Sequence, residues 1–190
     1  MSYYEVLLFL HVAAAVIWLG SGFFLQMLVL RAEKVGDRLL LKQISGYAGW
    51  MAQRIFIPAS LAVLILGILL TIEGPWSFDQ LWIVLGLVGY AISFLLGILF
   101  IEPEGKRIHT AMQAHGPESA EAGFHVHRIN VVSRMELVVL YLVIGVMALK
   151  PTGDDTGTLI IMAAAVLVTL AIGLPKLRAA PQTPAPASAD

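Results

Sequence analysis

Five long runs of apolar residues constrain this chain more than any other feature of its sequence. A helix that crosses the hydrocarbon core of a bilayer needs about 20 consecutive, mostly apolar residues. No alternation of the strand type competes with these runs, and a backbone inside a bilayer must satisfy its own hydrogen bonds, so helices follow. We predict membrane-spanning helices over residues 4–30, 55–72, 81–101, 135–149 and 158–174.

The composition also indicates lipid as the solvent. Hydrophobic residues make up 58% of the chain and charged residues 13%, against roughly 25% charged in soluble domains, and the mean hydropathy is +0.83. The net charge of −1 gives no basic field for nucleic acid, and the absence of cysteine excludes disulfides and thiolate chemistry. The first apolar run lacks a basic leader and a cleavage site, so we expect it to be retained.

We therefore expect an all-α fold, a single transmembrane domain over residues 1–178 with about five spans. Helical extensions are expected outside the membrane: an amphipathic helix around residues 37–44 at the membrane surface, and a second segment after Ser119, a plausible helix cap. The Pro- and Ala-rich tail, residues 179–190, is expected to be disordered.

The basic residues predict the orientation. Positive charge collects on the cytoplasmic side of membrane proteins. Eleven of the twelve Lys and Arg residues lie in the first connection, the third connection and the C-terminal flank, which leaves only Lys150 on the other side. The sequence therefore predicts an N-out, C-in protein of the cytoplasmic (inner) membrane that passes through it several times.

His11 is an ionisable residue inside the first span. Such residues are costly in lipid and indicate a functional site by default, although a histidine bonded to a neighbouring helix carbonyl is an equally open interpretation. Trp18 and Gly22 follow on the same face at helical spacing. That face either holds a flat ligand or packs against another helix.

A second group of polar residues is expected at the cytoplasmic border. Arg54 opens the second span with Met51 and Pro58, and it either anchors the helix or pairs with an acidic group. Glu136 enters the fourth span, where it is either a border carboxylate or the partner of Arg54. Pro58 is expected in the first turn of its span, where a missing amide donor costs least.

The remaining candidates have simpler explanations. His125 and His127 point to different faces of a helix, so we expect solvated residues rather than a metal site. Lys150 and Pro151 end the fourth span in the usual way for a helix C-terminus, with pairing to an outer carboxylate as an alternative. The seven methionines form no cluster of the kind that binds copper.

Several of these residues together resemble a known group of proteins. The resemblance lies in four segments: the run from Leu10 to Gly20, the Met51-Ala-Gln-Arg54 motif with Pro58-Ala59 and Gly67, the Arg128-Ile-Asn130 motif, and Lys150-Pro151. These segments are similar to the HemJ-type protoporphyrinogen oxidase superfamily. Copper-resistance D-type domains look distantly similar. The group also includes a family of bacterial integral membrane proteins of unknown function, and this chain resembles that family more closely, since it lacks the basic residues that HemJ-type proteins carry in helices 1 and 3. The resemblance spans residues 5–151.

The resemblance implies that His11 binds haem b as an axial ligand, and Met51 and Arg54 occupy matching positions. Helix geometry separates these residues, because a rise of about 1.5 Å per residue places His11 and Arg54 some 15–20 Å apart in depth. Lys150 is then the better partner for haem propionates, and Met147, at matching depth, is the predicted second ligand with His11. Trp18 completes the candidate cofactor site.

Two classes of function follow from the sequence. The first is a haem- or porphyrin-binding membrane protein with a redox role, an oxidoreductase if it is an enzyme. The second is a cofactor-free structural or partner-binding subunit, with a homo-oligomer as one form. Transport is a weaker third, because no span carries a row of polar residues and no inverted repeat is evident.

Overall fold

The computed structural model describes residues 2–116 and 119–178; the expected tail, residues 179–190, lies outside them. Every regular element in these ranges is helical, which confirms the all-α prediction. Five helices are long and apolar enough to cross a membrane. The elements are α1 (Tyr3–Val35), α2 (Arg38–Met51), η1 (Ala52–Phe56), α3 (Ile57–Glu73), α4 (Leu81–Leu96), η2 (Gly97–Ile101), α5 (Glu102–His115), α6 (Ala120–Leu149) and α7 (Thr156–Arg178).

Two of the spanning helices are longer than their apolar runs because the polar extensions continue them. The segment expected as a separate surface helix is helical, but it runs from α2 through η1 into α3 without a break. In the same way α4 continues through η2 into α5 as one helix over Leu81–His115. Ser119 caps α6 as predicted, since its hydroxyl accepts a hydrogen bond from the Ala122 amide.

A proline explains the π-helical turn inside each continuous helix. Pro58 and Pro103 have no N–H to give to the carbonyls of Arg54 and Leu99, four residues earlier. The π turns η1 and η2 cover those carbonyls and end shortly before each proline, so the wider turn accommodates the missing donor and the ring. Pro58 is the second residue of α3, in the first turn as expected, but the helix continues back through η1 to Arg38, so α3 does not begin at a free helix end.

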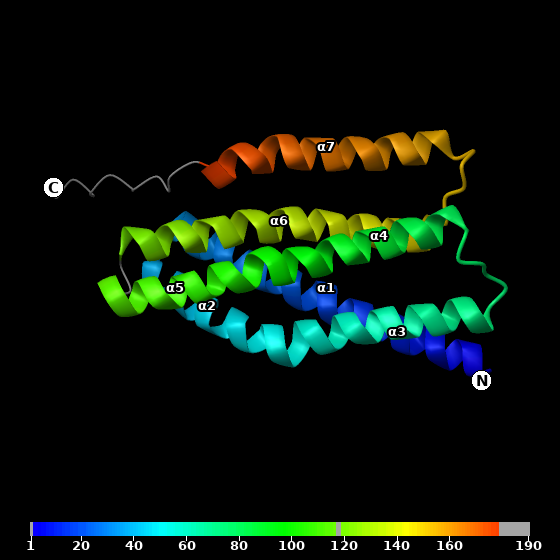
Figure 1. The fold of residues 1–190 in the computed structure, drawn as a ribbon, viewed down its shortest axis with the longest axis horizontal. Helices are drawn as coiled ribbons and strands as arrows, with labels where there is room; N and C mark the ends of the chain where they lie inside the picture. The colour runs from blue at the N-terminus through cyan, green and yellow to red at the C-terminus, as the bar shows by residue number, and fades with distance from the viewer. Residues whose placement is uncertain (1, 117–118, 179–190) are drawn as a thin grey trace.

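The helices form a bundle in which α6 is central. It packs against α1, α4, α5 and α7, while α1 packs against α2 and α3 (Figure 1). Glycines allow α4 to approach α6 closely: a Cβ on Gly86 would lie 2.0 Å from Cε of Met147, and one on Gly89 would lie 2.3 Å from Cγ2 of Val143. Small residues at such seams are how helices associate in lipid.

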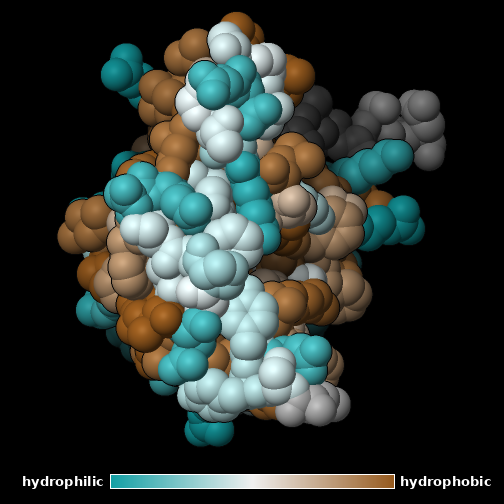
Figure 2. Space-filling view, turned by 90° about the vertical axis from the view of Figure 1, so that its right-hand side faces the viewer, coloured by the Kyte–Doolittle hydropathy of each residue, from teal (hydrophilic) through white to brown (hydrophobic). Residues whose placement is uncertain are grey.

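The bundle has two polar ends. One holds the N-terminus and the short connections after α3 and α6, and Figure 2, which looks onto this end, shows hydrophilic residues in the middle and apolar residues on the flanks. The other holds the ends of α1, α5 and α7 and the start of α2 and α6 (Figure 1). The basic residues, other than Lys150, belong to this second end, which we call the basic end. Its assignment to the cytoplasm remains a prediction.

Candidate functional site

His11 lies at the seam between α1 and α3. A Cβ on Gly67 would sit 3.1 Å from its Cε1 and 3.5 Å from its Nδ1, so the imidazole occupies the notch that Gly67 leaves in α3. The ring also lies beside the backbone carbonyl of Val63. Its Nδ1 is buried and has no hydrogen-bond partner in the described part of the chain. His11, the candidate ligand predicted from the sequence, thus has a buried ring nitrogen, and its imidazole is packed against α3.

Trp18, two turns further along α1, faces a different helix. Its ring meets that of Tyr90 on α4 edge to face, with centroids 5.9 Å apart, and Tyr90 stacks on Phe94. The Tyr90 hydroxyl is buried beside Ser60 of α3. Gly22, on the same face of α1, packs against Leu137 of α6. Helix packing, one of the two interpretations offered by the sequence, therefore accounts for this face.

Glu136 of α6 bonds to α4 rather than to Arg54. The hydroxyl of Ser93, which is 2% exposed, donates to its Oε1 at 2.5 Å. Arg54 is exposed, and no ion pair to it forms within residues 2–116 and 119–178. The Arg54–Glu136 pair, one of the two interpretations offered by the sequence, is therefore wrong, because Arg54 points out of the bundle and Glu136 points into it.

At the end opposite the basic end, Lys150 is held by aromatic rings. Its Nζ lies 3.9 Å from the centroid of Trp76 and 5.4 Å from that of Trp82, and Trp76 donates its indole N–H to the Tyr4 hydroxyl. The backbone of Lys150 is left-handed, with φ of 47°, and closes α6 by donating to the Val146 carbonyl. These contacts explain Lys150 as a helix end fixed by cation–π attraction.

The candidate residues do not meet in one place. Met147 fills the notch of Gly86 on α4, while His11 fills the notch of Gly67 on α3. Met51 lies further toward the basic end, in an apolar groove of about 240 Å³ that Phe24 and Trp50 also line. The structure thus distributes the residues predicted from the sequence over several seams, with His11 and Met147 packed against different helices.

The basic end carries a compact polar cluster, which we call the Glu104 cluster. Glu104 of α5 is 1% exposed. Its Oε1 lies 2.5 Å from Nη1 of Arg107 and 2.9 Å from Nη1 of Arg128, and its Oε2 lies 2.6 Å from Nδ1 of His125. Burial raises the pKa of Glu104, but the hydrogen bonds from His125 and Arg107 and the charge of Arg128 outweigh it, so the pKa stays below its ordinary value.

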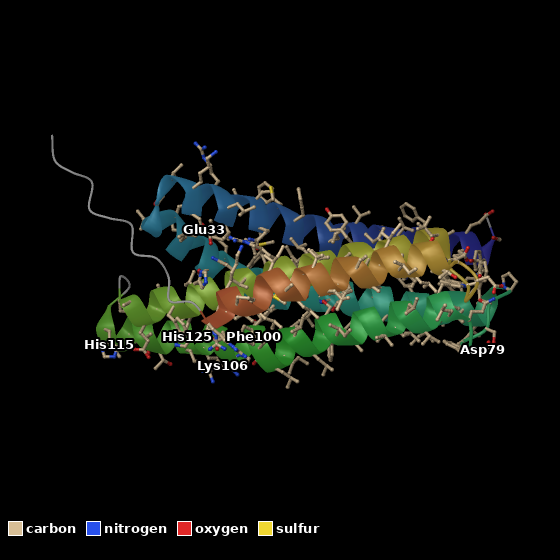
Figure 3. All side chains as sticks on the ribbon, turned by 90° about the horizontal axis from the view of Figure 1, so that it is seen from above. Glu33, Asp79, Phe100, Lys106, His115 and His125 are labelled. Carbon is tan, nitrogen blue, oxygen red and sulfur yellow. The ribbon has the colours of Figure 1, made fainter. Side chains whose placement is uncertain are left out.

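Sequence reasoning missed this cluster. His125 was expected to be solvated, but its side chain is 13% exposed and is bound to Glu104, so that expectation is wrong. The guanidinium of Arg128 also lies over the ring of Phe100, 5.1 Å from its centroid. Figure 3 shows Phe100, Lys106 and His125 close together at the basic end, far from Asp79 at the other. The signal available in the sequence was Glu104, a carboxylate just after the apolar run over residues 81–101, together with the later basic residue Arg128.

A second ion pair ties α1 to α6 nearby. Glu33 accepts hydrogen bonds from Arg134 and from the amide of Asn130. Arg128 and Asn130 are the motif residues of the resemblance, and in this structure both connect helices. Among the described residues no group of three or more His, Asp or Glu side chains is placed to hold a metal ion. At the basic end, ion pairs thus connect α5 to α6 and α1 to α6.

The comparisons place the chain among membrane proteins. Residues 5–151 match the family described as "Predicted integral membrane protein (DUF2269)". The chain belongs to this family. The match begins in α1 and ends just after α6, so the family region contains four of the five spanning helices and α7 lies beyond it. A search of curated proteins and a search of solved structures each found no match.

Proposed function

We propose that this protein resides in the cytoplasmic (inner) membrane and binds haem b, or a related porphyrin, through His11 in a redox role. The supporting observation is that His11 is an ionisable side chain inside a span whose buried Nδ1 makes no well-formed hydrogen bond in the described part of the chain, with only the Val63 carbonyl beside the ring. Buried polar atoms are usually satisfied, and an exception calls for an explanation. The imidazole nitrogen of histidine is a common axial ligand of haem iron. The resemblance to HemJ-type proteins indicates the same residue.

The other candidate residues fit a haem less well than His11 does. Met147 packs its methyl group against Gly86, and Lys150 rests on Trp76. Both would have to leave these contacts to serve as a second iron ligand and a propionate partner. The proposal therefore rests on His11 alone. A bound haem would supply one-electron chemistry, while this chain would hold the iron and exclude water with its apolar spans.

A cofactor-free structural or partner-binding subunit is the second candidate, and one observation favours it. The imidazole of His11 already fills the notch at Gly67, with Cε1 3.1 Å from the position of a Cβ there. A histidine packed in this way joins two helices without any ligand. A haem bound to His11 would then have to approach the imidazole from a side that does not face Gly67.

Haem absorbance separates the two candidates. The full chain is purified in detergent from cells supplied with haem precursor, together with His11→Ala, Met147→Ala and the control His109→Ala, whose imidazole is exposed on α5. Haem binding predicts a Soret band that is lost in His11→Ala and kept in His109→Ala. A changed band in Met147→Ala would identify the second ligand. A colourless wild-type protein would overturn the haem proposal and favour the partner-binding subunit.

A further inference from the structure

Glu136 is a carboxyl group inside the apolar part of the bundle. It lies 13 residues before Leu149, the end of α6, and so about 20 Å from that end. Its partner Ser93 lies 12 residues after Leu81, the start of α4, which gives about 18 Å on an independent helix. With a hydrocarbon core of about 30 Å, both helices place the pair within the membrane rather than in the headgroup region.

Among the residues that the structure describes, no ion pair to this carboxyl group forms. The charged and titratable groups on the helices packed here are Tyr90 on α4, His11 and Glu33 on α1 and Lys176 on α7, and α6 itself contributes Arg134 and Tyr141. Arg134 is already paired with Glu33, and Lys176 is exposed. Within the described ranges the single hydrogen bond to the Glu136 side chain comes from Ser93. An ionised carboxylate with one neutral donor is expensive in hydrocarbon, whereas the protonated acid is tolerated.

The surroundings provide polar groups that suit a protonated acid. The hydroxyl of Ser93 donates to Oε1, which leaves Oε2 as the oxygen that carries the proton. Tyr90 lies three residues before Ser93, on the same face of α4, and its hydroxyl is buried. It faces Ser60, which is 6% exposed on α3. Two helices, α3 and α4, thus contribute hydroxyl groups to this part of the membrane interior, and α6 contributes the carboxyl group.

We propose that Glu136 is a proton-binding site inside the membrane, where the carboxyl group is held as the neutral acid with Ser93 and exchanges its proton with bulk water. The chemistry is a single reversible step: a proton from water binds one carboxylate oxygen, and it returns to water when the acid ionises. The ligand is a proton rather than a metal cation, because the site offers one carboxyl and hydroxyls where Ca²⁺ or Mg²⁺ takes about six oxygens or more. This proposal is independent of haem at His11.

Infrared spectroscopy of the purified, haem-free protein tests the site directly. The neutral acid gives a C=O stretching band that a carboxylate lacks. We expect this band at neutral pH in the wild type and in Glu102→Gln, whose substituted residue is exposed at the basic end, and we expect its loss in Glu136→Gln. It should shift to higher frequency in Ser93→Ala, which removes the hydroxyl donor, and disappear reversibly when the pH is raised.

The outcomes decide the proposal even if one variant fails to fold. A wild type without an acid band at neutral pH overturns it, and so does a band that persists in a folded Glu136→Gln. Dicyclohexylcarbodiimide, an apolar reagent that adds to protonated carboxyl groups, gives an independent measurement on the wild type alone. Mass spectrometry should place one adduct on Glu136, with a yield that falls as the pH rises; adducts confined to exposed carboxyl groups would contradict the proposal.

Discussion

His125 and Glu104 form a contact that the chain brings together across 21 residues, with Nδ1 of His125 lying 2.6 Å from Oε2 of Glu104. Arg107 and Arg128 occupy the other carboxylate oxygen. The carboxylate is almost completely buried, and its partners come from both α5 and α6. The Glu104 cluster is therefore the strongest electrostatic contact between these two helices in the described structure.

Glu104→Gln should destabilise the protein strongly. The substitution leaves Arg128 and His125 facing a neutral amide, and removal of one member of a buried ion pair costs on the order of 3 kcal/mol. Thermal unfolding in detergent measures the effect. The matched control is Glu102→Gln on the same helix, since Glu102 makes an exposed bond to Lys106 that contributes at most about 0.5 kcal/mol. Equal losses in the two variants would contradict this role for Glu104.

The same cluster predicts a stability that depends on pH. The pKa of Glu104 is lower in the folded protein than its ordinary value of 4.5, so the folded state favours the ionised form. The stabilisation is complete above about pH 4.5 and is lost as the pH falls through the folded pKa. Unfolding midpoints measured against pH should show this acid limb in the wild type and in Glu102→Gln. The loss of stability at acid pH should be smaller in Glu104→Gln. An equal loss in that variant would show that groups other than Glu104 cause it.

Gly89→Ala should weaken the seam between α4 and α6. The new Cβ would lie 2.3 Å from Cγ2 of Val143, and a β-branched side chain on a helix has little freedom to move. Overpacking of this kind costs about 1–3 kcal/mol. Gly20→Ala on α1 is the control, because nothing lies within 4 Å of the added methyl group, and it should be neutral or slightly stabilising. Unfolding temperatures that rank the variants in the opposite order would refute the packing at Gly89.

The predicted N-out orientation is testable because the natural chain contains no cysteine. Single substitutions Ser77→Cys, in the connection after α3, and Gln113→Cys, near the end of α5, place thiols at opposite ends of the bundle, and both residues are exposed. A thiol reagent that cannot cross membranes should label only Ser77→Cys in intact cells and both after lysis. Labelling of Gln113→Cys alone in intact cells would reverse the orientation.

The sequence by itself determined the class of fold and the outline of the spans. Apolar runs of the length of a bilayer leave the backbone no alternative to helices, and the run over 81–101 coincides with α4 and η2. The segregation of basic residues also follows from the sequence alone. The extents of the helices did not, because the π turns before Pro58 and Pro103 let each helix continue past its apolar run.

Only the tertiary structure decided which polar residues meet. Glu136 was expected either as a carboxylate at the membrane border or as the partner of Arg54, but the rotation of α6 turns it toward Ser93 on α4. His125 was expected in solvent, but α5 continues far enough beyond the membrane for Glu104 to reach it. Spacing along one helix fixes which residues share a face, yet which neighbour that face meets depends on the packing of all the helices, here set by close contacts at Gly67, Gly86 and Gly89.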